Sequence, residues 1–241
     1  MTSRPTTEVS SPMIPDQEWR YEVKLVAPRF GLHLARSWIR AHSGAFAVSY
    51  PPRIVNNLYL DTHDMQWLDE SVEGLSERRK VRLRWYGDQS GTVAAVFEVK
   101  RKRDRANRKL RYPVAEPLEL IAGATWPGIV SRSLESLPGW IRAEIGADLV
   151  PVLVNRYRRE YYEDRSGKLR ITIDSEQDVY DQRLSARPNL TRRAPRRDSV
   201  VIEVKGPLDE WERIKEVANE FPIRVTRNSK YALGYESIGS I

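Results

Sequence analysis

Apolar and charged residues alternate strictly along several stretches of the chain, most clearly at residues 80–86 and 96–100. Successive side chains of a β-strand point to opposite faces. The first stretch therefore predicts a strand with Arg82 and Arg84 on one face and Val81 and Leu83 on the other. The same alternation returns near residues 20–25, 168–174 and 200–205. These stretches predict strands with one apolar face and one face of mixed but mainly basic charge.

Two arrangements give this alternation. An antiparallel sheet with one face on a core and the other in water is the simpler one. The repeated pairing of charges at positions i and i+2 favours a second arrangement, in which the strands close into a barrel and the charged faces converge on its interior. Cations held that close repel one another unless a polyanion lies between them. The pattern therefore favours a highly charged ligand.

The remaining pattern predicts a single domain at residues 19–241, preceded by a flexible tail, rich in Ser, Thr and Pro, at residues 1–18. Helices are predicted near residues 30–44, 64–73 and 208–221. Residues 116–146 are predicted to be mostly helical, with breaks at Pro127 and Pro138. A mobile basic loop is predicted at 185–198, and a short last segment begins at residue 227. Strands are predicted at residues 19–26, 53–61, 78–86, 92–102, 109–114, 152–162, 169–174 and 200–205.

Composition limits the classes of function. The chain has 241 residues, 30% of them charged and 40% hydrophobic, and its formal net charge of +7 favours anionic partners. It has no cysteine, which excludes disulfides and thiolate chemistry. It has neither an apolar run of about 20 residues nor an apolar signal core, so a cytoplasmic location is expected. A membrane-protein partner and the oligomeric state stay open.

Few familiar catalytic motifs are present. The three histidines lack the spacing of a metal site, and neither a P-loop nor a Gly-x-Ser-x-Gly turn occurs. The remaining acidic candidates are Glu22, Glu98 and Glu203, which lie on predicted strands among basic residues. One or two of these glutamates would be enough to hold a hard divalent ion together with substrate phosphates and water. Alternatively, they only neutralise the neighbouring bases.

A series of short motifs carries a resemblance to a known family. They stand in order at residues 22–24, 78–84, 97–100, 109–112, 157–159, 169–174, 201–205 and 229–231. Together they resemble the polyphosphate polymerase (VTC) domain, a branch of the triphosphate tunnel metalloenzyme (CYTH-like) superfamily. The resemblance implies an α+β fold, in which an antiparallel eight-stranded β-barrel with flanking helices encloses a basic tunnel that holds a triphosphate.

The resemblance also implies roles for individual residues. Glu203 and Glu22 are expected to bind a divalent metal, Mn²⁺ or Mg²⁺. The expected substrate-binding residues are Lys24, Lys109, Lys205, Arg227 and Ser229. Catalytic contacts to the phosphates are expected from Arg82, Arg84, Lys100, Arg159, Arg170 and Lys230.

The activity implied by the resemblance is transfer of the γ-phosphate of ATP to a growing inorganic polyphosphate chain. The first alternative is a triphosphatase that hydrolyses inorganic triphosphate or a small organic triphosphate, because the Glu22-x-Lys24 element is common in the wider superfamily. The second is a non-catalytic module that binds polyanions. No specific binding of nucleic acid is expected, since nucleic-acid readers usually combine exposed basic patches with aromatic platforms.

Overall fold

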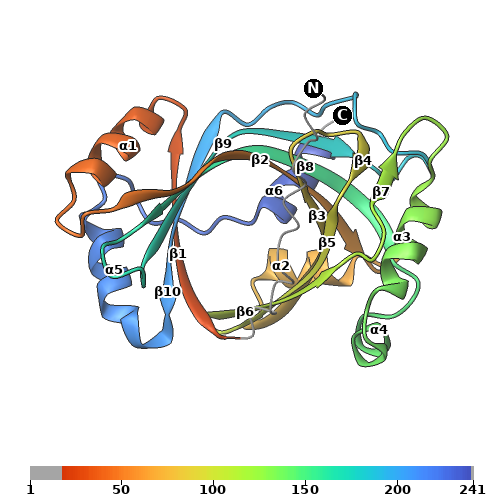
Figure 1. The fold of residues 1–241 in the computed structure, drawn as a ribbon, viewed down its shortest axis with the longest axis horizontal. Coiled ribbons are helices and arrows are strands. Elements are labelled where there is room, and N and C mark those ends of the chain that lie inside the picture. The colour runs from red at the N-terminus through yellow and green to blue at the C-terminus, as the bar shows by residue number, and fades with distance from the viewer. Residues whose placement is uncertain (1–17, 240–241) are drawn as a thin grey trace, which may run out of the picture.

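A computed structural model describes residues 18–239 (Figure 1). The tail predicted at residues 1–18 lies outside the described residues, except for Glu18. Eight strands form one closed barrel in the order β1-β10-β9-β8-β2-β3-β5-β6, with every neighbouring pair antiparallel. This arrangement confirms the predicted fold class. The barrel strands are β1 (Arg20–Pro28), β2 (Ala47–Asp61), β3 (Glu77–Tyr86), β5 (Ala95–Arg103), β6 (Ala106–Pro113), β8 (Val150–Glu163), β9 (Arg170–Asp181) and β10 (Ser199–Pro207).

The apolar faces of the strands point out of the barrel and are covered by helices. On one side, Leu25, Ile173 and Ile202 pack with residues of α1 and α5, among them Ile39 and Ile214. Each such buried side chain contributes roughly 1.5–3 kcal/mol through its removal from water. The helices are α1 (Gly31–Ala41), α2 (Gln66–Glu73), α3 (Trp126–Glu135), α4 (Gly139–Ile145), α5 (Trp211–Glu220) and α6 (Lys230–Ile238), with the 3₁₀ turn η1 (Leu208–Glu210) before α5.

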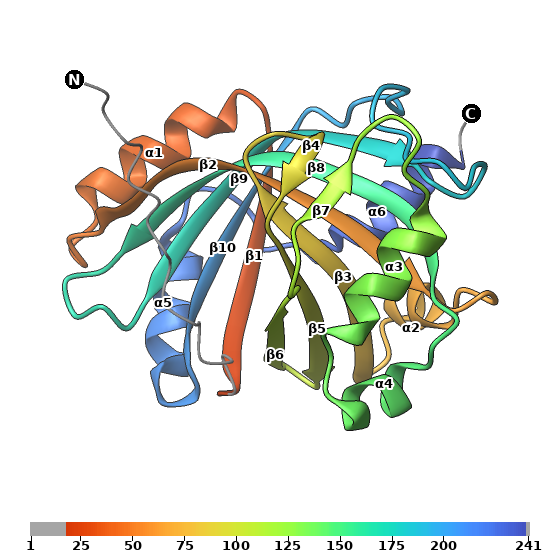
Figure 2. The same ribbon diagram turned by 45° about the vertical axis from the view of Figure 1, so that its right-hand side comes forward.

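A second core covers the opposite side of the barrel. Leu83, Trp85 and Phe97 are fully or almost fully buried there against Trp126 of α3 and Ile141 of α4. The small sheet of β4 (Gly91–Val93) and β7 (Leu118–Leu120) lies on this side, next to α3 (Figure 2). Because hydrophobic packing occupies the outside of the strands, their charged faces are left to the interior.

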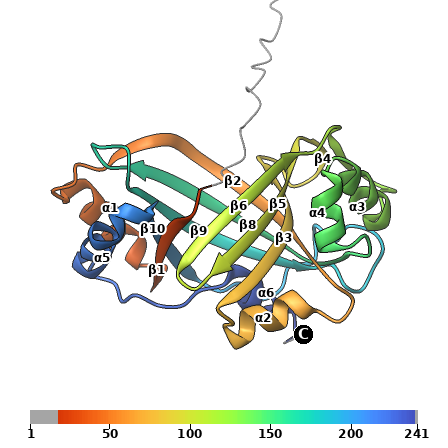
Figure 3. The same cartoon turned by 90° about the horizontal axis from the view of Figure 1, so that it is seen from below.

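Helices α2 and α6 lie at one end of the barrel (Figure 3). The Tyr231 ring of α6 stacks on Tyr59 of β2, with centroids 4.8 Å apart and an interplanar angle of 7°. The Tyr231 hydroxyl donates to Asp61 at 2.5 Å, and the same carboxylate accepts from the backbone N–H groups of Trp67 and Leu68 at the start of α2. Asp61 therefore fixes both helices to the end of β2.

Several predicted boundaries are wrong. Residues 118–120 form strand β7 instead of part of a helix, because their own Leu-x-Leu alternation buries Leu118 and Leu120 in the outer core. The strand predicted at 92–102 is divided into β4 and β5, and β2 and β9 are longer than predicted.

Helix α6 is absent from the predicted elements. Its central Gly234 lowers the helix propensity of the segment. In the fold, a Cβ at this position would lie 3.1 Å from a methyl group of Leu153, so glycine allows α6 to approach β8 closely.

The basic loop predicted to be mobile at 185–198 is irregular, but it is attached to β9. Arg193 and Arg196 form ion pairs of 3.0 and 2.8 Å with the buried carboxylate of Asp178. The backbone N–H of Ala194 donates to the carbonyl of Val179 at 2.8 Å. Two of the five arginines of this loop thus hold it against β9.

Across residues 18–239, none of the helices is long and apolar enough to cross a bilayer.

Candidate active site

The barrel interior is lined by ion pairs with an excess of basic groups. Four carboxylates, those of Glu22, Glu98, Asp174 and Glu203, share this space with ten basic side chains, which is an excess of six basic groups. The basic side chains are those of Lys24, Lys80, Arg82, Arg84, Lys100, Lys109, Arg111, Arg159, Lys205 and Lys230.

Glu98 of β5 is the centre of one half of this lining. Its carboxylate is 2% exposed and lies 2.6 Å from Arg82, 3.5 Å from Arg84 and 3.2 Å from Arg111. The three arginines come from strands on both sides of Glu98: β3 supplies Arg82 and Arg84, and β6 supplies Arg111. Burial alone would raise the pKa of Glu98, but Arg84 and the other cations hold it well below its usual range. Glu98 therefore acts as an internal counterion for the three guanidinium groups.

Glu203 of β10 is the centre of the other half. Its carboxylate lies 3.1 Å from Lys24 and 3.5 Å from Lys230, and it also contacts Lys205. Burial opposes its ionisation, yet the surrounding cations keep the pKa of Glu203 well below its usual range. Its neighbour in the barrel, Glu22 of β1, lies 3.2 Å from Lys24.

Arg159 of β8 is held in a fixed orientation. It donates two hydrogen bonds to Asp174 of β9, at 2.5 and 2.6 Å, and a third of 3.3 Å to Glu203. Lys230 at the start of α6 lies 2.6 Å from the same Asp174 carboxylate, which is fully buried. Such bidentate pairs fix the plane of a guanidinium group and hence the direction of its remaining donors.

Two interior lysines have no carboxylate within ion-pair distance anywhere in residues 18–239. Lys80 of β3 donates to the hydroxyl of Ser229 at 2.6 Å, and Lys109 of β6 lies near Arg111 and Arg84. Burial lowers the pKa of both amines well below the usual lysine value; neighbouring cations reinforce this at Lys80, whereas at Lys109 the nearby Glu98 opposes it only in part. Because a cation in this environment is costly, an anionic ligand would relieve the cost.

Water reaches the same interior. Four side chains that point into the barrel are still 21% to 24% exposed to solvent: those of Lys24, Lys100, Lys205 and Arg111. The interior is therefore lined by packed ion pairs but is accessible to water.

The carboxylates of Glu22 and Glu203 suit a hard divalent ion as a pair. They come from adjacent strands, and both lie within 3.2 Å of the same atom, Lys24 Nζ. Both stay ionised, as a metal ligand must. No group of three or more acidic, histidine or cysteine side chains is arranged around one point in the described chain. Two carboxylates fit an ion of the Mg²⁺ or Mn²⁺ type, which completes its shell with water and substrate phosphates.

The structure brings together most of the residues predicted for the site. Two of them lie apart from the group. Arg170 is on the same face of β9 as Asp174, but its side chain is 51% exposed at the end of the strand and pairs with Glu163. Arg227 is exposed in the loop before α6, with its guanidinium beside Gly74 at the end of α2. The residues that lie together are Glu22, Lys24, Arg82, Arg84, Lys100, Lys109, Arg159, Glu203, Lys205, Ser229 and Lys230.

Sequence reasoning assigned no role to Lys80, Arg111 or Asp174. The alternation did place each of them on the interior face of its strand, because each lies two or four positions from a predicted site residue. Lys80 lies on the same face as Arg82, Arg111 on the same face as Lys109, and Asp174 on the same face as Arg170. The alternation along a strand identifies the face on which a side chain lies. It does not identify which charges on that face become partners, because this depends on the register between strands.

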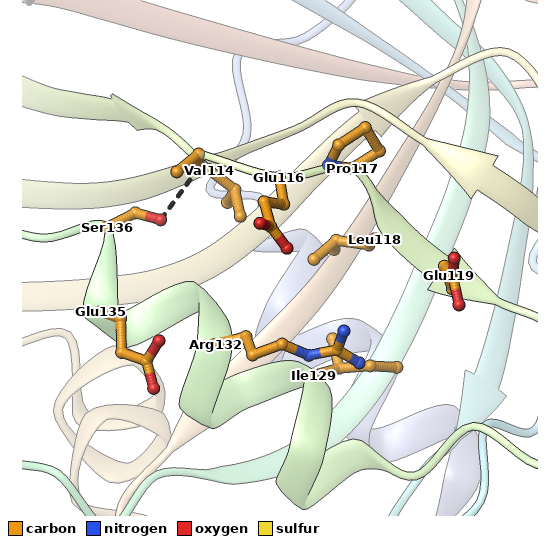
Figure 4. Close-up of a pocket in the computed structure, with 10 residues that line it drawn as sticks. Val114, Glu116, Pro117, Leu118, Glu119, Ile129, Arg132, Glu135 and Ser136 are labelled. Atoms are coloured by element: carbon orange, nitrogen blue, oxygen red, sulfur yellow. Dashed lines mark hydrogen bonds between the residues drawn. The ribbon is translucent and has the colours of Figure 1, made fainter.

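Cavities on the outside of the barrel are less suited to a polyanion. One, of about 220 Å³, lies between the β6–β7 connection and α3, and its lining includes Glu116, Glu119 and Glu135 with only Arg132 as a base (Figure 4). Another, of about 480 Å³, lies beside α3 and α4 and is lined mainly by apolar residues. Neither contains a cluster of cations comparable with that in the barrel.

Comparison with known proteins places this architecture among related folds. A Hippeastrum protein, described as a candidate adenylyl cyclase with a dominant triphosphatase activity, superposes with a TM-score of 0.55 over 91% of this chain and 95% of its own, at 16% identity. A candidate adenylate cyclase from Vibrio parahaemolyticus gives a TM-score of 0.50 over 92% and 98%, at 12% identity. At these identities the likeness concerns the fold alone.

Among curated protein sequences, none is significantly similar to the chain. The model of the VTC domain family, in contrast, matches residues 20–238, which is nearly everything that the structure describes. This match confirms the resemblance that the strand motifs indicated. The chain belongs to the VTC domain family.

Proposed function

We propose that this protein is a metal-dependent phosphotransferase that moves the γ-phosphoryl group of ATP to the end of an inorganic polyphosphate chain. The observation that carries the proposal is the excess of basic groups inside the barrel, in particular Lys80 and Lys109, which have no carboxylate within ion-pair distance in residues 18–239. Membership of the VTC domain family supports the same class of substrate.

The interior side chains have the properties that phosphoryl transfer requires. The transferred group carries charge on its equatorial oxygens, so catalysis is largely positioning and electrostatic stabilisation. Arg82, Arg84 and Arg159 offer planar donors whose directions are fixed by Glu98 and Asp174. In the proposed reaction, a terminal oxygen of the acceptor chain attacks the γ-phosphorus, the bond to the β,γ-bridging oxygen breaks, and ADP leaves.

A general base is unnecessary for this transfer, because the attacking phosphate oxygen is already anionic. Glu203 and Glu22 would hold the divalent ion, with Lys24, Lys205 and Lys230 balancing their charge. When bound, such an ion supplies charge neutralisation on phosphate oxygens and polarises the bond that breaks.

Hydrolysis is the second candidate. The water-accessible interior leaves room for a water molecule in place of the acceptor, and a protein of the same fold is described as having dominant triphosphatase activity. A polyanion-binding module without turnover is the third.

Product analysis separates the three functions. Purified protein is incubated with ATP and Mn²⁺, and the products are resolved on a gel and assayed for orthophosphate. Long polyphosphate chains with stoichiometric ADP are expected. Orthophosphate without chains would indicate a triphosphatase instead of a polymerase, whereas tight binding without any turnover would indicate a binding module.

Affinity for inorganic tripolyphosphate should fall as the pH rises through about 8. Lys102 lies on the same face of β5 as Lys100, and burial and the nearby Arg78 lower its pKa to about 8. The pKa values of Lys80 and Lys109 are also lowered. These amines lose their protons as the pH rises, while a bound polyanion favours the protonated form and raises the pKa. Binding of tripolyphosphate should therefore be accompanied by uptake of protons by these lysines. Calorimetry at pH 8 in buffers of different ionisation enthalpy measures this uptake, and a buffer-independent heat would contradict the assignment of these lysines to the ligand.

A further inference from the structure

Three tyrosines surround one arginine at the end of the barrel where β3 terminates. The guanidinium carbon of Arg53 lies 5.1 Å from the ring centroid of Tyr50 and 5.0 Å from those of Tyr86 and Tyr161. The rings of Tyr50 and Tyr161 also meet edge to face at 5.9 Å. We refer to these four residues as the aromatic rim.

The aromatic rim is continuous with the charged interior. Arg53 of β2 is the register partner of Arg159 of β8, whose guanidinium binds Asp174 and Glu203. Tyr161 is the partner of Thr172, which in turn is the partner of Glu203 on β10. A molecule bound at the rim therefore lies only two strands away from Glu203, the residue proposed to bind the metal.

The rim has features that a phosphate-binding site does not need. Tyr50 and Tyr86 are 53% and 43% exposed, although burial of their rings would be favourable. Arg53 is exposed as well, and its guanidinium has neither a carboxylate nor a hydrogen-bond acceptor as partner within residues 18–239. Its N–H groups are thus available to a ligand, beside the exposed parts of the Tyr50 and Tyr86 rings, which suit a planar aromatic group.

We infer that the aromatic rim binds the base of a nucleoside triphosphate, with the triphosphate extending into the barrel. Nucleobases stack on aromatic side chains, and a guanidinium group adds cation–π attraction and donors for ring nitrogens. An inorganic polyphosphate has no planar group and would gain nothing from the rings. This inference rests on the proposed function and adds to it a selection of nucleotide donors over inorganic ones.

The test compares two ligands that share the triphosphate but differ in the base. Binding of the β,γ-imido analogue of ATP and of inorganic tripolyphosphate is measured by calorimetry in EDTA. In the Tyr50→Leu/Tyr86→Leu double variant, the Kd for the ATP analogue should rise about tenfold or more, while that for tripolyphosphate should stay within about twofold. Arg53→Lys keeps the charge but loses the planar group, so it should act in the same direction.

Trp140→Leu is the matched control, because Trp140 is 58% exposed on α4, outside the barrel. It should leave both Kd values unchanged, and thermal melting of every variant confirms that it is folded. If the rim variants bind both ligands more weakly by the same factor, the rim attracts anions in general and does not recognise the base. If binding of both ligands is unchanged, the rim is not part of the binding site. Either result overturns the inference but leaves the proposed function intact. If the wild-type protein binds neither ligand, the proposed function itself fails.

Discussion

Replacing Glu203 by Gln should lower metal-dependent turnover about 100- to 1,000-fold, because the substitution removes one of the two carboxylates that would hold the divalent ion. Gln retains the size and the acceptor oxygen of Glu203, so the contacts of Arg159 and Lys24 have a partner in the variant. The measurement is initial rate against Mn²⁺ concentration. The wild-type rate should saturate with the metal, whereas the residual rate of the variant should depend on it only weakly.

Binding without metal separates this role from a general loss of structure. In EDTA, the variant should bind tripolyphosphate at least as tightly as the wild type, since one negative charge has been removed next to the phosphates. The matched control is Glu220→Gln, because Glu220 is 62% exposed and pairs with His42 outside the barrel. Unchanged turnover in Glu203→Gln would exclude Glu203 from the mechanism, and lost binding in EDTA would indicate a folding defect instead.

Replacing Glu98 by Gln should destabilise the ligand-free protein by about 3 kcal/mol, a typical cost of removing one partner from a buried ion pair. Arg82, Arg84 and Arg111 would then face one another without a counterion, in a site where Glu98 is 2% exposed. For a domain of this size, the expected fall in Tm is about 10 °C. Thermal melting followed by circular dichroism measures it.

A bound polyanion should restore part of this loss. Tripolyphosphate brings negative charge to the same arginines, so it should raise the Tm of Glu98→Gln by more than it raises the Tm of the wild type. The matched control is Glu77→Gln, which removes a largely exposed pair with Arg103 and should leave the Tm and its ligand response unchanged. An equal rise in the variant and in the wild type would show that the ligand binds away from Glu98.

The alternation of residues predicted the strands of the barrel and the face on which each charge lies, because side-chain parity is a local property of a strand. It predicted neither the depth of a side chain nor its partners. Arg170 and Asp174 share a face of β9, yet one is half exposed at the strand end and the other is fully buried against Arg159.

Elements fixed by tertiary contacts were the hardest to predict. Gly234 weakens the helical signal of α6, and the helix is secured by the contact of Tyr231 with Asp61, which lies 170 positions earlier in the sequence. The aromatic rim is a similar case, since its four residues come from β2, β3 and β8 and meet only when the barrel closes.

The extent of pairing between neighbouring strands differs around the barrel. β1 is paired with β10 at nine positions but with β6 at only two, through Arg20 and Tyr21 (Figure 3). Local opening is least costly where the fewest hydrogen bonds and contacts must be broken. We therefore expect the barrel to open first at the β1–β6 seam, with two strand edges exposed and the outer cores still packed. Glu22 of β1 pairs with Lys100 of β5 across this seam, so such a separation also breaks that ion pair, whereas Glu22 and Glu203 stay on the paired strands β1 and β10.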